Sequence, residues 1–119
     1  MVRIAFFGDS FVEGDILLGD LRDTLQTRWG GEGVGFVPIT SEVARFRRTL
    51  QQSYENWKTY GIVKRNGGNP PYGINGFVYY PKPGAEVHYE NSYQFKHTRQ
   101  WSKVRLFYSN TSDSGMVYR

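Results

Sequence analysis

The feature that most constrains the fold of this chain is an apolar run that ends in a small polar turn. Five of the six residues in positions 2–7 are apolar, with no strict alternation of apolar and polar side chains. This pattern is typical of a strand that is buried on both faces of a parallel sheet. Gly8 ends the predicted strand, and Asp9 and Ser10 form the turn that follows.

The next segment has the apolar spacing of an amphipathic helix. Its apolar residues recur at helical intervals, at Ile16, Leu17, Leu21, Leu25 and Trp29. We therefore expect a helix over residues 16–29, ended by the glycines at 30 and 31. A strand, a serine turn and a helix in this order place the Ser10 hydroxyl at the carboxyl end of a strand. Sheets of α/β proteins carry their sites at that edge.

The Gly8-Asp9-Ser10 triplet resembles the first motif of the SGNH (GDSL-type) ester hydrolases, in which an N-terminal strand ends in Gly-Asp-Ser. Residues 11–15, the helix and the glycine-rich segment 30–38 resemble a bacterial branch of that family. This branch includes peptidoglycan O-acetylesterase-like enzymes, and a β-sandwich module is inserted in them soon after the first motif. The resemblance covers about the first 40 residues, and the flanking strand and helix give the triplet its significance.

The resemblance implies that Ser10 is the nucleophile and that its backbone N–H contributes to the oxyanion hole. Asp9 and Gly8 would support the turn. In the implied reaction, Ser10 attacks an ester carbonyl, and water releases the acyl-enzyme. The acyl group is expected to be small, such as acetyl on a carbohydrate, and no cofactor is implied. The alternative is a turn serine that caps a backbone N–H before the helix.

The family's other catalytic motifs do not occur in this chain. The base would come from an Asp-x-x-His motif, but Ala85 and Gln94 stand three residues before His88 and His97. Residues 73–76 are the nearest string to the family's Gly-x-Asn-Asp, and they lack the final acid. We therefore expect an N-terminal piece of a longer hydrolase, whose partner is the C-terminal remainder or a second copy of the chain. The predicted strand at residues 116–119, interrupted by the chain end, favours the same interpretation.

Beyond residue 40 the sequence favours short strands separated by turns. Nine tyrosines and eight phenylalanines, with β-branched residues, favour strands over helices. The predicted strands cover residues 43–50, 54–65, 72–80, 85–90, 103–109 and 116–119, with turns at 66–71, 81–84 and 110–115. This spacing predicts an antiparallel β-sandwich of jelly-roll type.

The predicted fold class is thus mixed α and β, mainly β. Residues 1–40 would be the strand-turn-helix piece of an SGNH hydrolase, and residues 41–119 an inserted, incomplete β-sandwich module. A second hypothesis treats the strands from about residue 43 onward as a non-catalytic module that binds carbohydrate or protein.

Aromatic side chains are numerous enough to form a surface on which sugars stack. The candidates are Trp57, Tyr60, Tyr72, Tyr79, Tyr80, Tyr93 and Trp101. Most of them should fill the core of a small sandwich. Tyr72 and Tyr80 lie beside predicted turns, and they are the preferred binding residues because loops commonly carry sites.

Charge and composition narrow the remaining function classes. The net charge of +4 is mild, and scattered basic residues fit the wet faces of strands, so no nucleic-acid partner is expected. Glu86, His88 and Glu90 would share one strand face and could bind a divalent cation, but such a trio is more often a solvated face, and no metal is expected. Without cysteines the chain has no disulfides or thiolate nucleophile. No membrane span or signal peptide is predicted, whereas the resemblance implies a secreted or periplasmic location.

Overall fold

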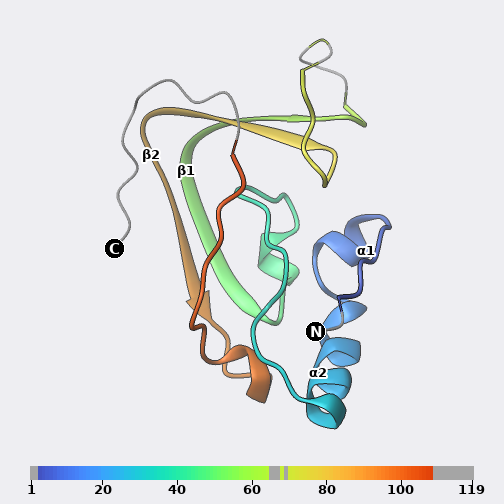
Figure 1. Ribbon diagram of the computed structural model, residues 1–119. Coiled ribbons are helices and arrows are strands. Elements are labelled where there is room, and N and C mark those ends of the chain that lie inside the picture. Colours follow the sequence, from blue (N-terminus) through green and yellow to red (C-terminus); the bar gives the residue numbers. More distant parts are fainter. Residues whose placement is uncertain (1–2, 65–67, 69, 109–119) are drawn as a thin grey trace.

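The computed structural model describes residues 3–64, 68 and 70–108, and in this part the chain is a small mixed α/β protein. Its helices are α1 (Ser10–Glu13) and α2 (Leu18–Trp29), with 3₁₀ turns at Ala44–Phe46 and Lys96–Thr98. Strands β1 (Leu50–Gly61) and β2 (Phe77–Asn91) form one two-stranded antiparallel sheet. Figure 1 shows the sheet on one side and the two helices on the other, with residues 30–43 running between them.

The two strands are long and bend together part of the way along the ladder (Figure 1). The pairing shifts between Glu55 and Trp57. At this point Asn56 and Gly84 have positive φ angles of 59° and 74°, and the Asn56 Nδ2 donates to the Gly84 carbonyl at 3.1 Å. A bulge of this kind removes residues from the ladder and increases the local bend. It also accommodates Pro83, which has no N–H to donate to the ladder.

The predicted turn at residues 81–84 is therefore wrong as a chain reversal. Residues 77–80 and 85–90, predicted in separate strands, both belong to β2 and both pair with β1. The Pro-Lys-Pro-Gly string bends one strand, because Pro83 and Gly84 lie in the bulge, whereas Pro81 still pairs with Trp57. The reversal lies earlier, in the connection over residues 62–76. The predicted turn at 66–71 falls in this connection, although residues 65–67 and 69 are outside the described part.

Three other strand predictions are wrong for the residues that the structure describes. Residues 43–49 contain a 3₁₀ turn, since Arg47 points inward to bond backbone carbonyls. Residues 3–7 and 103–108 belong to no strand and are exposed. A segment with an alternating or apolar pattern forms a strand only where a neighbouring strand pairs with its backbone. Among the described residues, no strand pairs with residues 3–7, 43–49 or 103–108. The predictions for residues 109 and 110–119 lie outside the described residues.

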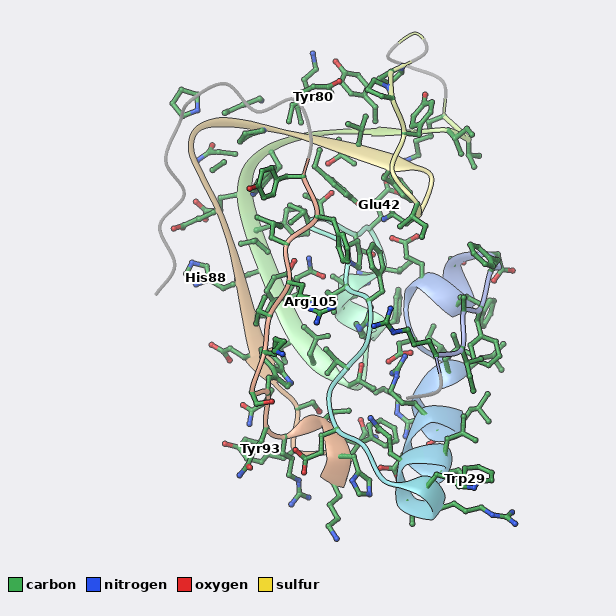
Figure 2. All side chains as sticks on the ribbon, viewed as in Figure 1. Trp29, Glu42, Tyr80, His88, Tyr93 and Arg105 are labelled. Carbon is green, nitrogen blue, oxygen red and sulfur yellow. The ribbon has the colours of Figure 1, made fainter. Side chains whose placement is uncertain are left out.

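The predicted helix over residues 16–29 is confirmed from Leu18 to Trp29, but its predicted packing is not. Helix α2 ends at Trp29 as expected, where Gly30 takes a φ of 79° and donates its N–H to the Gln26 carbonyl. Three residues of the predicted apolar stripe, Leu17, Leu21 and Trp29, are 64%, 39% and 69% exposed. Figure 2 shows Trp29 projecting away from the sheet.

The buried side of α2 is instead marked by Gly19. A β-carbon at this position would lie 3.4 Å from the side chains of Phe95 and Thr49. The helix therefore approaches Thr49 and Phe95, which flank the sheet in sequence, through its smallest residue, while Leu21 and Trp29 remain exposed.

The interior of the described part is small and mostly polar. Its buried apolar side chains are Leu50 and Phe95, and its buried polar or charged residues are Asp15, Thr40, Ser41, Arg47, Thr49 and Thr98. Segment 38–41 is attached to the sheet by side-chain hydrogen bonds. Gln52 donates to the carbonyls of Pro38 and Ile39, and the Tyr89 hydroxyl donates to Pro38 at 3.0 Å.

One sheet is present in residues 3–64, 68 and 70–108, so the predicted sandwich remains a hypothesis for the whole chain. Neither α1 nor α2 is long and apolar enough to cross a membrane, and the same holds for every helix in the described part.

Candidate functional site

The Gly8-Asp9-Ser10 triplet forms a tight entry into α1. Asp9 is the N-cap residue: its Oδ1 accepts the Phe11 N–H at 3.0 Å, and its carbonyl accepts the Val12 N–H at 3.0 Å. Aspartate is among the preferred N-cap residues because its short carboxylate reaches these free donors. A β-carbon at Gly8 would lie 2.6 Å from the Val12 Cγ2, so a larger residue would displace Val12. The local geometry thus requires both the glycine and the aspartate.

Ser10 is the first residue of α1 and is exposed on the surface. Its carbonyl accepts the Gly14 N–H at 2.8 Å, which fixes its backbone. Within the described residues, neither the Ser10 hydroxyl nor its N–H makes a hydrogen bond. Both groups are therefore free to contact an approaching molecule, and the cap is provided by Asp9 and not by Ser10.

The two histidines bond to other partners. His88 Nε2 on β2 lies 3.5 Å from Glu86 Oε2, and both side chains are exposed. His97 Nε2 lies 3.2 Å from the Thr27 hydroxyl near the end of α2. Neither histidine is hydrogen-bonded to Ser10 within the described residues. The same residues contain no group of three His, Asp or Glu side chains that could hold a metal ion.

A buried charged cluster lies behind the Ser10 turn; we call Asp15, Arg22, Arg47 and Thr49 the Asp15 cluster. Asp15 is 2% exposed and has a φ of 57°, a left-handed conformation that aspartate tolerates better than most residues. Its carboxylate accepts two hydrogen bonds from the Arg22 guanidinium and one from the Thr49 hydroxyl at 2.6 Å. Arg47 NH2 lies 3.7 Å from the same carboxylate.

Arg47 connects this cluster to the surrounding backbone. Its guanidinium donates to the carbonyls of Val34, Phe36 and Glu13 at 3.4, 3.1 and 3.4 Å. Burial lowers the pKa of Arg47, and the neighbouring Asp15 carboxylate partly offsets that effect. The cluster therefore attaches the loop after α1 to Thr49, the residue before β1, and to segment 34–36, and Arg47 also bonds the last residue of α1.

Little in the sequence indicates this cluster. Asp15 lies just before the predicted helix, and Arg22 is one of several charged residues within it. Arg47 falls in a segment whose partial alternation predicted a strand, and Thr49 carries no chemical signal. Their proximity depends on how segment 30–49 folds back, which local patterns do not encode.

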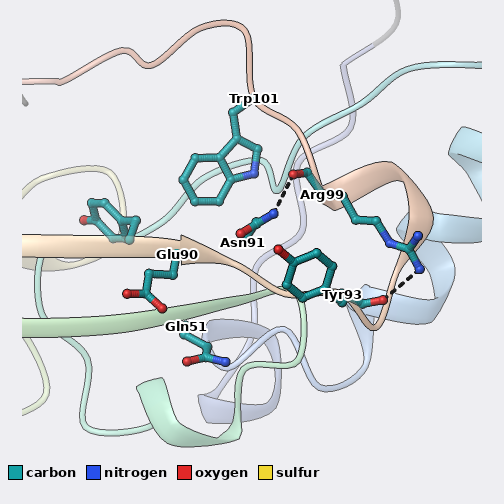
Figure 3. Close-up of a pocket in the computed structure, with 7 residues that line it drawn as sticks. Gln51, Glu90, Asn91, Tyr93, Arg99 and Trp101 are labelled. Atoms are coloured by element: carbon teal, nitrogen blue, oxygen red, sulfur yellow. Dashed lines mark hydrogen bonds between the residues drawn. The ribbon is translucent and has the colours of Figure 1, made fainter.

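An open groove lies at the end of the sheet where β1 starts and β2 ends. Its volume is about 440 Å³, and besides Tyr89 its lining consists of Gln51, Glu90, Asn91, Tyr93, Arg99 and Trp101 (Figure 3). Tyr93 is 75% exposed and borders the groove with its ring. The lining thus combines aromatic rings with amide, carboxylate and guanidinium groups.

Hydrogen bonds hold three sides of this groove. Asn91 Nδ2 donates to the Arg99 carbonyl at 2.8 Å, and Arg99 NH2 donates to the Tyr93 carbonyl at 2.9 Å, as the dashed lines in Figure 3 show. The Trp101 indole N–H donates to the Thr98 carbonyl at 3.0 Å. These bonds orient the side chains of Asn91, Arg99 and Trp101.

Tyr72 and Tyr80, the preferred binding residues from the sequence, lie outside the lining of this groove. Tyr80 is 42% exposed and packs edge-to-face on Tyr60 with a centroid distance of 5.9 Å. Tyr72 is half-buried in the connection between the strands. Tyr93 and Trp101 belonged to the wider aromatic set, but their grouping depends on the fold of residues 91–101, which the sequence pattern did not indicate.

Comparison with known proteins adds no relative: the chain matches no protein-family model, no curated protein and no solved structure.

Proposed function

We propose that this chain carries the nucleophile of a serine ester hydrolase of the SGNH type, which removes small acyl groups from a carbohydrate. One observation carries the proposal. Ser10 stands exposed, with its hydroxyl and N–H free of the protein contacts described, in a Gly-Asp-Ser turn between the apolar segment 3–7 and α1. A nucleophile needs this accessibility, and a turn serine that caps its helix does not have it.

In the proposed reaction the Ser10 hydroxyl attacks the ester carbonyl while a histidine takes its proton. The Ser10 N–H and further donors stabilise the oxyanion, the alcohol leaves with a proton, and water hydrolyses the acyl-enzyme. Asp9 and Gly8 hold the turn. The histidine is supplied by a partner, which is either the C-terminal remainder of the hydrolase or a second copy of this chain.

Exposed apolar side chains support the need for such a partner. Ile4, Phe6 and Phe7 are 59%, 46% and 80% exposed in a segment that no described strand pairs with. Large exposed apolar groups close together mark interaction surfaces. The segment is proposed to be a strand of a parallel sheet that the partner completes, with residues 41–119 forming the sandwich module.

A second candidate function is saccharide or protein binding without catalysis. The groove at the end of the sheet favours it, because its aromatic and polar lining does not involve Ser10.

The test is hydrolysis of a chromogenic acetyl ester by this chain and by the longest polypeptide that its gene encodes. We expect turnover in the longer protein, and we expect Ser10→Ala to lower it by about a thousandfold or more. Ser53→Ala, which alters an exposed serine on β1, is the matched control and should keep full activity. Turnover that survives Ser10→Ala, or no turnover in either protein, would contradict the proposal.

A further inference from the structure

We infer that the groove at the end of the sheet binds a neutral saccharide, with Tyr93 and Trp101 as stacking surfaces. The inference rests on the proposed function, because it locates the carbohydrate that carries the ester. The observations behind it are nevertheless separate from Ser10, and they concern the shape, chemistry and charge of the groove itself.

The aromatic part of the lining suits a sugar ring. A pyranose has an apolar face of C–H groups and an edge of hydroxyls, so its site needs an open aromatic face beside hydrogen-bonding groups. Tyr93 is 75% exposed, so its ring is accessible to a ligand. The Trp101 N–H is already bonded to the Thr98 carbonyl, so its ring is oriented and only its apolar surface is left for a ligand.

The polar part of the lining can bond hydroxyls. Gln51 and Asn91 each bring an amide, and Glu90, which pairs with Gln51 across the ladder, brings two carboxylate oxygens. Such groups offer both donors and acceptors, as a hydroxyl requires. Figure 3 shows Asn91 and Trp101 on one side of β2 and Glu90 and Gln51 on the other, so these groups surround the end of the strand.

The charge of the groove favours a neutral ligand. Glu90 and Arg99 contribute one charge of each sign, and the Arg99 guanidinium is already bonded to the Tyr93 carbonyl. A phosphate or sulfate group would meet the Glu90 carboxylate, which would oppose its binding. A volume of about 440 Å³ lies within the range of small-ligand sites.

The experiment titrates the 119-residue chain with cellotetraose and with chitotetraose, two neutral oligosaccharides, followed by calorimetry and by amide NMR shifts. We expect saturable, millimolar or tighter binding of at least one of them, with shifts centred on Gln51, Glu90 and Asn91. Tyr93→Ala should weaken it about tenfold or more, since stacking residues dominate such sites. Tyr93→Phe keeps the ring and should stay within about threefold, and Tyr80→Ala, outside the groove, should change nothing.

No saturation by either oligosaccharide, or equal binding by the Tyr93→Ala variant, would overturn the inference. Tyr93 is exposed, so this variant is expected to fold normally. Ser10→Ala separates the two proposals. If the oligosaccharide binds but turnover does not depend on Ser10, the hydrolase proposal is refuted and the saccharide-binding proposal is supported. If turnover depends on Ser10 but neither oligosaccharide binds, the saccharide-binding proposal is refuted and the hydrolase proposal is supported.

Discussion

The N-terminal unit, residues 3–29, and the β1–β2 hairpin differ in how they are held in the fold. The hairpin pairs its backbone along a ladder and bonds segment 38–41 through Gln52 and Tyr89. The N-terminal unit exposes apolar residues such as Phe7 and Trp29, and it is attached to the rest through the buried charges of the Asp15 cluster. The N-terminal unit is thus attached by polar contacts, and its exposed apolar surface is available for contact with another molecule.

The largest expected effect comes from breaking the polar attachment. Asp15→Asn keeps the size of the side chain, and asparagine also adopts the left-handed backbone of this position readily. The substitution removes the carboxylate that the guanidinium groups of Arg22 and Arg47 contact. Removing one partner of a buried ion pair costs about 3–5 kcal/mol of unfolding free energy. Urea denaturation would measure the loss. Asp20→Asn breaks the exposed pair with Arg48 and should cost at most about 1 kcal/mol; equal losses in the two variants would contradict the comparison.

A leucine in each region tests the apolar side of the comparison. Leu50, at the start of β1, is 0% exposed, and Leu17, before α2, is 64% exposed. Leu50→Ala should lower the unfolding free energy by about 2–5 kcal/mol, because it removes buried methyl groups and leaves a cavity. Leu17→Ala should stay within about 0.5 kcal/mol in the isolated chain. Thermal and urea unfolding of both variants would check this, and a costly Leu17→Ala would mean that the N-terminal unit has an apolar core.

The sequence predicted the local elements of the N-terminal unit better than their packing. The apolar spacing and Gly30 located helix α2 and its end, since these signals lie in neighbouring residues. The spacing also predicted a buried stripe, but Leu17, Leu21 and Trp29 are exposed. Periodicity shows which residues share a face, and it does not show whether anything covers that face.

In the hairpin the errors have a different source. Pro81 and Gly84 were interpreted as a reversal because this string usually marks a turn, whereas a bulge opposite Asn56 keeps β2 in one piece. For the candidate site, the Gly8-Asp9-Ser10 triplet could be found because it is contiguous. The Asp15 cluster and the groove could not, since each joins residues that are tens of positions apart and meet only after folding.

A smaller effect is expected from crowding the turn in the N-terminal unit. Gly8→Ala places a β-carbon 2.6 Å from the Val12 Cγ2, and overpacking of this kind costs about 1–3 kcal/mol. Val12→Ala in the same chain removes the clashing methyl groups and should restore most of the loss. Unfolding curves of both single variants and of the double variant would measure this coupling. If the two losses simply add, Val12 does not constrain Gly8.

The smallest effect concerns the hairpin at alkaline pH. Burial raises the pKa of the Tyr89 hydroxyl to about 12, with Arg47 lowering it in part. The unfolded chain loses this proton near pH 10 and the folded chain keeps it, so stability is complete below pH 10 and falls as pH rises toward 12. Burial raises the pKa of Tyr79 to about 12 as well, so both groups contribute to the slope.

Tyr89→Phe should therefore reduce, but not remove, the fall of unfolding free energy between about pH 10 and 11. At pH 7 the variant loses one hydrogen bond and about 1 kcal/mol, while the Pro38 carbonyl keeps its bond from Gln52. The stability curves of the variant and the parent chain should thus converge as pH rises. Urea denaturation of the variant and the parent chain at several pH values would show the convergence. Parallel curves for Tyr89→Phe and the parent would mean that the Tyr89 hydroxyl is solvated and that segment 38–41 is not held against the sheet in solution.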